Sequence, residues 1–202
     1  MPQAAAYDGL TPAPLVVYLH GGGAGMVTEP DMVCSCSKFC SSWGWISAFP
    51  KCPNQPKTGA WNCAEGEACV FDLIAKLREQ YAIDSRRIYL AGGSMGGWGT
   101  LYIAGRHPDR FAAVGAAAPE CIGVDPQGLK KLPVFLVHGD KDVVCHADRT
   151  RALDADLARL GGVHKYVEIK GAGHALPDEA IQQLFDWIAN YALSEKPVSG
   201  KR

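Results

Sequence analysis

Residues 87–97 read RIYLAGGSMGG, and this stretch decides the fold that the sequence predicts. A short apolar run rich in strand-forming residues leads into glycines on either side of Ser94, and a helical pattern begins at Met95. A Gly-x-Ser-x-Gly pattern between a strand and a helix is typical of a sharp turn that holds a serine hydroxyl clear of a sheet. A glycine-rich turn with an unreactive serine would show the same sequence pattern. The flanking strand and helix favour the interpretation of Ser94 as a nucleophile.

Strand and helix patterns alternate on both sides of this turn, which predicts an α/β fold. The expected strands cover residues 15–19, 45–49, 87–91, 111–118, 132–137 and 166–169. The expected helices cover residues 65–81, 95–106, 148–160 and 178–193. The sequence therefore predicts a mostly parallel sheet of about six strands flanked by helices.

The 202 residues are expected to form a single domain, with an N-terminal extension over residues 1–14 and a polar, mobile tail over residues 194–202. Lys and Arg number 20 and Asp and Glu number 21, so no excess positive charge would attract nucleic acid or an anionic membrane. No apolar run approaches the roughly 20 residues of a membrane span, and the first residues lack the pattern of a signal peptide. We expect a soluble protein, either cytoplasmic or secreted after removal of a signal absent from this chain.

Six of the 8 cysteines lie between residues 34 and 69. An even count is consistent with disulfides in this region, but that inference is strongest for short secreted chains, so the alternative of free thiols stays open. A metal cluster at Cys34, Cys36 and Cys40 is disfavoured, because the spacing is not the Cys-x-x-Cys that brackets zinc. We expect neither a metal nor a cofactor.

A serine nucleophile needs a histidine base, which in this type of fold follows the last strand. His174 lies in the sequence GAGHA (residues 171–175), directly after the last expected strand, and is the preferred base. His146 and His164 are the competitors, but neither follows that strand. The remaining histidines are expected to be structural: His20, His107 and His138.

The base needs a carboxylate that orients it, placed between the serine and the histidine along the chain. The sequence HGDKD (residues 138–142) follows an expected strand and offers two candidates. Asp142 is preferred, because Asp140 lies close to the strand end and is expected to cap the turn through its side chain.

Negative charge that develops on a substrate carbonyl oxygen requires preorganised N–H donors. The backbone N–H of Met95, the residue after the nucleophile, is one expected donor. The other is expected in the loop HGGG (residues 20–23) after the first strand, at Gly22. The competing interpretation of this loop is a flexible glycine turn.

Five motifs in this order resemble a known family: LHGGG at 19–23, GGSMGG at 92–97, HPDRF at 107–111, HGDKD at 138–142 and GH at 173–174. They are similar to the phospholipase/carboxylesterase and dienelactone-hydrolase-like branch of the α/β-hydrolase superfamily, including its feruloyl-esterase-like and polyhydroxybutyrate-depolymerase-like relatives. The resemblance spans about residues 15–191 and implies a serine esterase that acts on a small-molecule ester through an acyl-enzyme. Dienelactone hydrolases themselves use a cysteine nucleophile, so lactone activity is not implied.

The chain departs from this family in two places. Relatives usually begin with two extra strands, whereas only 14 residues precede the first expected strand here, and the cysteines at 34–40 are foreign to the pattern. Many relatives insert a lid between the strands expected at 111–118 and 132–137, where this chain has only about thirteen residues. This short connection predicts an open site without a large lid, suited to small acyl esters or exposed ends of larger molecules.

Aromatic residues offer candidates for binding the substrate. Trp43 and Trp61 are the preferred ones, whereas Trp45 and Trp98 are expected to pack in the core.

Two other functions compete with ester hydrolysis. Peptide hydrolysis of the oligopeptidase type is disfavoured, because such enzymes usually carry a further domain that screens substrates, and 202 residues leave no room for it. A non-catalytic binding protein on a hydrolase scaffold would typically lack one of the three catalytic side chains, and all three candidates are present.

Overall fold

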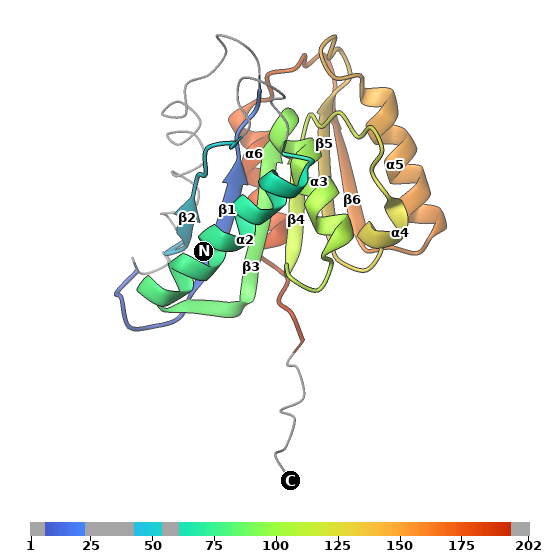
Figure 1. Ribbon diagram of the computed structural model, residues 1–202. Coiled ribbons are helices and arrows are strands. Elements are labelled where there is room, and N and C mark those ends of the chain that lie inside the picture. Colours follow the sequence, from blue (N-terminus) through green and yellow to red (C-terminus); the bar gives the residue numbers. More distant parts are fainter. Residues whose placement is uncertain (1–6, 23–42, 54–60, 195–202) are drawn as a thin grey trace.

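The computed structural model describes residues 7–22, 43–53 and 61–194. Figure 1 shows a twisted sheet with helices packed against both of its faces. The strands are β1 (Ala13–Leu19), β2 (Ile46–Ala48), β3 (Ile83–Gly93), β4 (Ala113–Ala117), β5 (Val134–Gly139) and β6 (His164–Ile169). They form a 6-stranded sheet in the order β2-β1-β3-β4-β5-β6, and all neighbouring pairs are parallel. The predicted parallel sheet of about six strands is confirmed.

Five helices of the described residues cover this sheet: α2 (Ala64–Gln80), α3 (Met95–Arg106), α4 (Pro126–Leu129), α5 (Ala147–Arg159) and α6 (Asp178–Ile188). One core cluster joins α2, α3, α4 and α5 to one face of the sheet, and a second joins α6 to the other face. Alternate residues of β1 explain why both faces are apolar: Val17 belongs to the first cluster, and Val16 and Tyr18 belong to the second. None of the described helices is long and apolar enough to cross a lipid bilayer.

Element boundaries follow the sequence closely where the apolar pattern and the punctuating residues agree. The helix expected at 95–106 has those bounds in the structure. The helix expected at 178–193 ends at Ile188 instead. Apolar residues continue beyond Ile188, but the helix does not. Leu193 packs against the second core cluster, and its N–H donates to the carbonyl of Arg86 at 2.9 Å instead of to a helical partner.

Helix α4 is too short for any periodic pattern and was not predicted. It begins after Asp125, whose side chain accepts a hydrogen bond from the N–H of Gln127 at 2.9 Å. It is the only helix in the connection from β4 to β5, which lies entirely within the described residues.

The turn from β3 to α3 is the tightest part of the fold. Ser94 has φ 55 and ψ −122, a backbone conformation that residues other than glycine rarely adopt. Gly96 lies so close to β1 that a Cβ on it would stand 1.9 Å from the carbonyl oxygen of Leu19. A Cβ on Gly92 would stand 2.5 Å from the carbonyl carbon of Gly96. The two glycines of the motif therefore let helix and strands approach while the serine projects between them.

Replacement of Gly96 by Ala is expected to destabilise the protein by about 3 kcal/mol, because overpacking against backbone cannot be relieved by a rotamer change. The matched control is Gly105→Ala in the same helix, where the nearest atom to the added Cβ is the Asp125 carbonyl oxygen at 3.4 Å. Urea denaturation gives both free energies of unfolding. Equal values for the two variants would contradict this account of the turn.

Candidate active site

Three loops at the carboxyl ends of parallel strands carry the candidate catalytic side chains. Ser94 follows β3, Asp142 follows β5 and His174 follows β6. Since the carboxyl ends of parallel strands lie along one edge of a sheet, residues far apart in the sequence meet there.

The structure brings the three predicted residues together in one line of hydrogen bonds. The Ser94 hydroxyl lies 2.9 Å from His174 Nε2, and His174 Nδ1 lies 2.7 Å from Asp142 Oδ2. The Nδ1 hydrogen therefore points to the carboxylate, which leaves Nε2 free to accept the serine proton. The Ser94 backbone is held by its own N–H, which donates to the Ala117 carbonyl at 2.8 Å.

The two acid candidates have different surroundings. The Asp142 side chain is fully buried, and its Oδ1 accepts the N–H groups of Val144 at 2.8 Å and Cys145 at 3.0 Å. Asp140 instead accepts the N–H of Gly171 at 2.6 Å and so ties two loops together. Only Asp142 of these two contacts the candidate base.

Burial acts to raise the pKa of Asp142, but hydrogen bonds from His174 and from the N–H groups of Val144 and Cys145 outweigh it. The net effect holds the pKa of this carboxyl below its ordinary value. Asp142 is therefore ionised near neutral pH, as a group that stabilises an imidazolium must be.

The competing histidines lie elsewhere. His164 contacts the Gly162 carbonyl at 2.8 Å and Asp154 at 3.2 Å, and His146 is the residue before α5. His107 hydrogen-bonds to Glu67. His20 Nε2 accepts the N–H of Cys52 at 3.0 Å. None of these is hydrogen-bonded to Ser94 in the part of the chain that the structure describes.

His138 has a contact that the sequence analysis missed. It is fully buried, and its Nε2 lies 3.0 Å from Asp142 Oδ2. The sequence analysis expected only a structural role near the strand end. The spacing of 138 and 142 in HGDKD was the available signal for a contact with the acid.

The two expected oxyanion donors belong to the turn after β3 and to the loop after β1. The first intrahelical hydrogen bond of α3 runs from the Trp98 N–H to the Ser94 carbonyl, so the N–H of Met95 precedes the helical ladder and has no acceptor within it. The loop after β1 lies against this turn, since a Cβ on Gly22 would stand 2.5 Å from Met95 Sδ and one on Gly21 would stand 3.4 Å from Ser94 Cβ.

A cavity of about 500 Å³ opens beside Ser94 and His174. Apart from these two, its lining is apolar or glycine with one tyrosine: Tyr18, Gly21, Gly22, Gly93, Ala117, Ala118, Val144, Ala175, Leu176 and Ile181. Among the residues that the structure describes, no Asp, Glu, Lys or Arg lines it. Within the described ranges, no three His, Cys, Asp or Glu side chains are grouped so that they could hold a metal ion.

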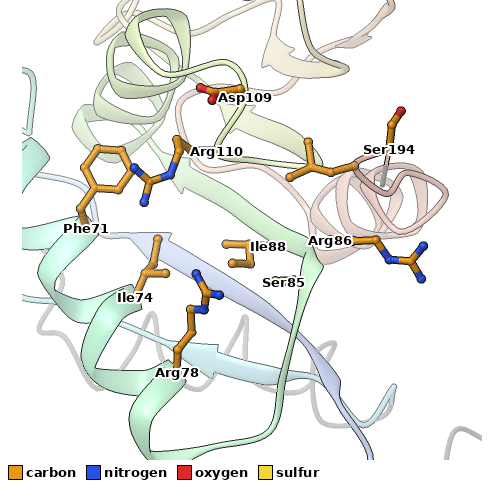
Figure 2. Close-up of a pocket in the computed structure, with 10 residues that line it drawn as sticks. Phe71, Ile74, Arg78, Ser85, Arg86, Ile88, Asp109, Arg110 and Ser194 are labelled. Atoms are coloured by element: carbon orange, nitrogen blue, oxygen red, sulfur yellow. The ribbon is translucent and has the colours of Figure 1, made fainter. Parts of the chain in front are cut away.

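A larger hollow of about 640 Å³ is lined by residues of α2, β3 and neighbouring loops (Figure 2). Arg78 extends toward Ile88, Arg110 lies over the ring of Phe71, and Arg86 points away from Ile88. Neither Ser94 nor His174 lines this hollow, so it is separate from the candidate active site.

The structure does not support the expected substrate contacts of Trp43 and Trp61. Trp61 is completely buried, and its indole N–H donates to the His20 carbonyl at 3.0 Å. Trp43 packs edge-on against Trp45, with ring centroids 5.0 Å apart, in the second core cluster. Neither side chain lines the cavity, because both are taken up in packing. Trp45 packs against the second core cluster as expected and stacks on Tyr89. The expectation for Trp98 is wrong: this side chain is only partly buried and belongs to neither core cluster, and its indole N–H donates to the Ile122 carbonyl at 2.7 Å.

The three cysteines of the disfavoured metal cluster, Cys34, Cys36 and Cys40, lie outside the described residues, as does Gly23 of the expected oxyanion loop. Elsewhere Cys69, Cys121 and Cys145 are free thiols. Burial raises the pKa of Cys121 to about 11, which keeps this thiol protonated and weakly nucleophilic.

The low pKa of Asp142 predicts a pH-dependent contribution to stability. A carboxyl whose pKa is depressed in the folded state stabilises it above the unfolded pKa of about 3.9, and this contribution is lost as the pH falls through the folded value. The stability advantage of the wild type over Asp142→Asn should therefore shrink as the pH is lowered below about 4. Urea titrations from pH 7 to pH 2 measure it, and an advantage independent of pH would contradict the assignment.

Comparisons with known proteins agree with this architecture. Residues 60–121 match the profile of the Prolyl oligopeptidase family, a span that includes the Ser94 turn. A bifunctional acetylxylan esterase/xylanase, XynS20E, from Neocallimastix patriciarum is 23% identical over 222 residues, which cover 93% of this chain and 32% of that protein. The chain thus spans about a third of the length of this curated relative.

Two solved structures show the same fold. Esterase PE8 superposes with a TM-score of 0.73 at 21% identity, covering 92% of this chain and 96% of that one. A ferulic acid esterase from Anaeromyces mucronatus, in complex with ferulic acid, gives a TM-score of 0.69 at 21% identity, covering 92% and 81%. With its parallel sheet, the Ser94 turn after β3 and these structural neighbours, the chain is an α/β-hydrolase in fold.

Proposed function

We propose that this protein is a serine carboxylic-ester hydrolase that acts through an acyl-enzyme on small or exposed esters. The observation that carries the proposal is the unbroken line of hydrogen bonds from Asp142 through His174 to Ser94 at the mouth of an apolar cavity. A hydroxyl, a base and a buried carboxylate in this order are the parts that nucleophilic acyl transfer needs.

Each residue has one task in the proposed cycle. Ser94 Oγ attacks the ester carbonyl carbon while its proton passes to His174 Nε2, and Asp142 stabilises the imidazolium. The N–H groups of Met95 and Gly22 receive the carbonyl oxygen as it becomes negative. The intermediate collapses when His174 returns the proton to the leaving alkoxide, which departs as the alcohol. Water then adds by the same route, releasing the carboxylic acid and restoring the serine.

The cavity supports an uncharged acyl group. The described part of its lining holds no Asp, Glu, Lys or Arg, so an acyl group with a free carboxylate would lose its hydration there without gaining an ionic partner. Between β4 and β5 the chain forms only the four-residue helix α4, and this connection supplies no large lid. Both features favour small or exposed esters. The structural neighbours named as esterases also support an ester substrate.

Peptide hydrolysis is the second candidate, and the match to the Prolyl oligopeptidase family favours it. That match ends at residue 121, before Asp142 and His174, so it concerns the nucleophile turn rather than the complete site. The same turn serves ester and peptide substrates, because both chemistries begin with serine attack on a carbonyl carbon. The relatives named as esterases favour the ester.

Reaction with a fluorophosphonate probe tests the nucleophile. The wild type should be labelled at Ser94, and Ser94→Ala should lose all labelling. Asp142→Asn should react about 10⁴-fold more slowly, because the base then adopts the wrong tautomer. The matched control, Asp140→Asn, removes the other carboxylate of the same loop and should react at nearly the wild-type rate. Absence of labelling in the folded wild type would favour a non-catalytic binding protein.

The lining residue Ile181 tests which part of the site receives the acyl group. Ile181→Trp should lower kcat/KM for hexanoyl and feruloyl esters by roughly tenfold or more but leave acetyl esters within about threefold, because only the larger groups need the filled space. Ile122→Trp is the control, since Ile122 is 51% exposed and does not line the cavity. Rates on chromogenic esters of increasing length measure this, and an equal loss for all esters would place the acyl group elsewhere.

A further inference from the structure

His138 stands out among the buried polar groups of the described chain because it joins β5, the loop after β5 and α5 next to the candidate acid. It is the penultimate residue of β5, has no exposed surface, and contacts Asp142 Oδ2 at 3.0 Å and the Cys145 carbonyl at 2.8 Å through Nε2. Its other nitrogen, Nδ1, lies 2.8 Å from the hydroxyl of Thr150 on α5. Thr150 is likewise fully buried.

These contacts assign the hydrogens. A carboxylate oxygen and a backbone carbonyl can only accept, so Nε2 of His138 must carry a hydrogen that it donates to both. In the neutral ring Nδ1 is then an acceptor, and the Thr150 hydroxyl is its donor. The direction of donation therefore runs from α5 through the imidazole to the acid.

The result is a carboxylate with every acceptor direction occupied. Oδ1 of Asp142 accepts two backbone N–H groups, those of Val144 and Cys145. Oδ2 accepts the Nδ1 hydrogen of His174 at 2.7 Å and the Nε2 hydrogen of His138. A carboxylate offers about four lone-pair sites, so all of them are used, and a partial rotation of this group would lengthen or break at least one of the four bonds.

We propose that His138, with its ring orientation set by Thr150, is a positioning residue that holds Asp142 in the orientation in which it binds His174. This inference rests on the proposed function, since it assigns the acid–base pair a support that matters only if the pair works in catalysis. His138 itself does not line the cavity, and its hydrogen bonds go to Thr150, Asp142 and Cys145 rather than to Ser94. Its loss should therefore affect the chemical step and leave substrate binding unchanged.

The test compares steady-state kinetics of purified variants on a chromogenic acetyl ester. His138→Leu removes the donor while keeping a buried side chain of similar size, and kcat should fall by about tenfold or more with KM within about twofold of the wild type. His138→Gln places an amide N–H near the original Nε2 position and should recover most of kcat. Thr150→Val, an isosteric change that leaves the imidazole in place, should lower kcat by about threefold to tenfold.

The matched control is His164→Leu. His164 is also a histidine at one end of a strand with a carboxylate partner, Asp154 at 3.2 Å, but it lies outside the line of bonds to Ser94. The His164→Leu substitution should leave kcat and KM unchanged. Circular dichroism shows which variants are folded, and if His138→Leu is not, the comparison of Thr150→Val and His138→Gln with the wild type decides the matter.

The two proposals fail in different ways. A wild type that reacts with neither ester nor fluorophosphonate overturns the proposed function. A reactive wild type whose folded His138→Leu variant keeps kcat within twofold, or loses activity through KM alone, overturns only the positioning role. Failure of His138→Gln to recover kcat, with folding intact, also overturns it, because the donor hydrogen would then not be what the acid requires.

Discussion

The whole site depends on one close approach, that of the first turn of α3 to the end of β1. No side chain fits at Gly96, because the Leu19 carbonyl oxygen occupies the place of its Cβ. This approach forces the chain to reverse within a single residue, and Ser94 takes a positive φ as a result. Such strain costs of order 1–3 kcal/mol, and the packed sheet and helix on either side maintain it.

The same approach aligns the groups that would receive a negative oxygen. Helix α3 begins directly after Ser94, so the N–H of Met95 and the positive end of the helix dipole lie beside the hydroxyl. The loop after β1 is brought over the turn by the strand that Gly96 touches, and Gly21 and Gly22 therefore line the cavity. Ser94 and the two candidate donors are thus positioned by the same backbone contact.

The sequence was sufficient for the parts of the fold that repeat. Alternation of apolar strands and amphipathic helices predicted the parallel sheet, and the glycines around Ser94 predicted the turn, because both patterns reflect local geometry. The order of Ser94, Asp142 and His174 along the chain predicted which loops meet, since parallel strands place their carboxyl ends together.

The sequence could not predict which neighbours a given side chain contacts. Trp61 lies in an irregular segment, where no periodic pattern indicates which way a side chain points. In the structure its ring is enclosed by the core, with its centroid 5.3 Å from the centroid of the His20 ring. The partner of His138 was hidden for a related reason. Its contact with Asp142 arises from the course of the loop after β5, and the bond to Thr150 depends on how α5 packs against that strand.

Asp142 shows why a buried carboxyl group stays ionised only when hydrogen-bond donors surround it. An isolated carboxylate in the interior would take up a proton, because its desolvation costs more than neutralisation. Asp142 escapes this because two backbone N–H groups and two imidazoles surround it, and the turn from Asp142 to Cys145 supplies the first two without any side chain. The remaining two donors differ in their surroundings: His174 is partly exposed and its other nitrogen faces the Ser94 hydroxyl, whereas His138 is enclosed on every side. In the proposed cycle, the enclosed donor keeps the carboxylate in place while the base takes up and returns the proton.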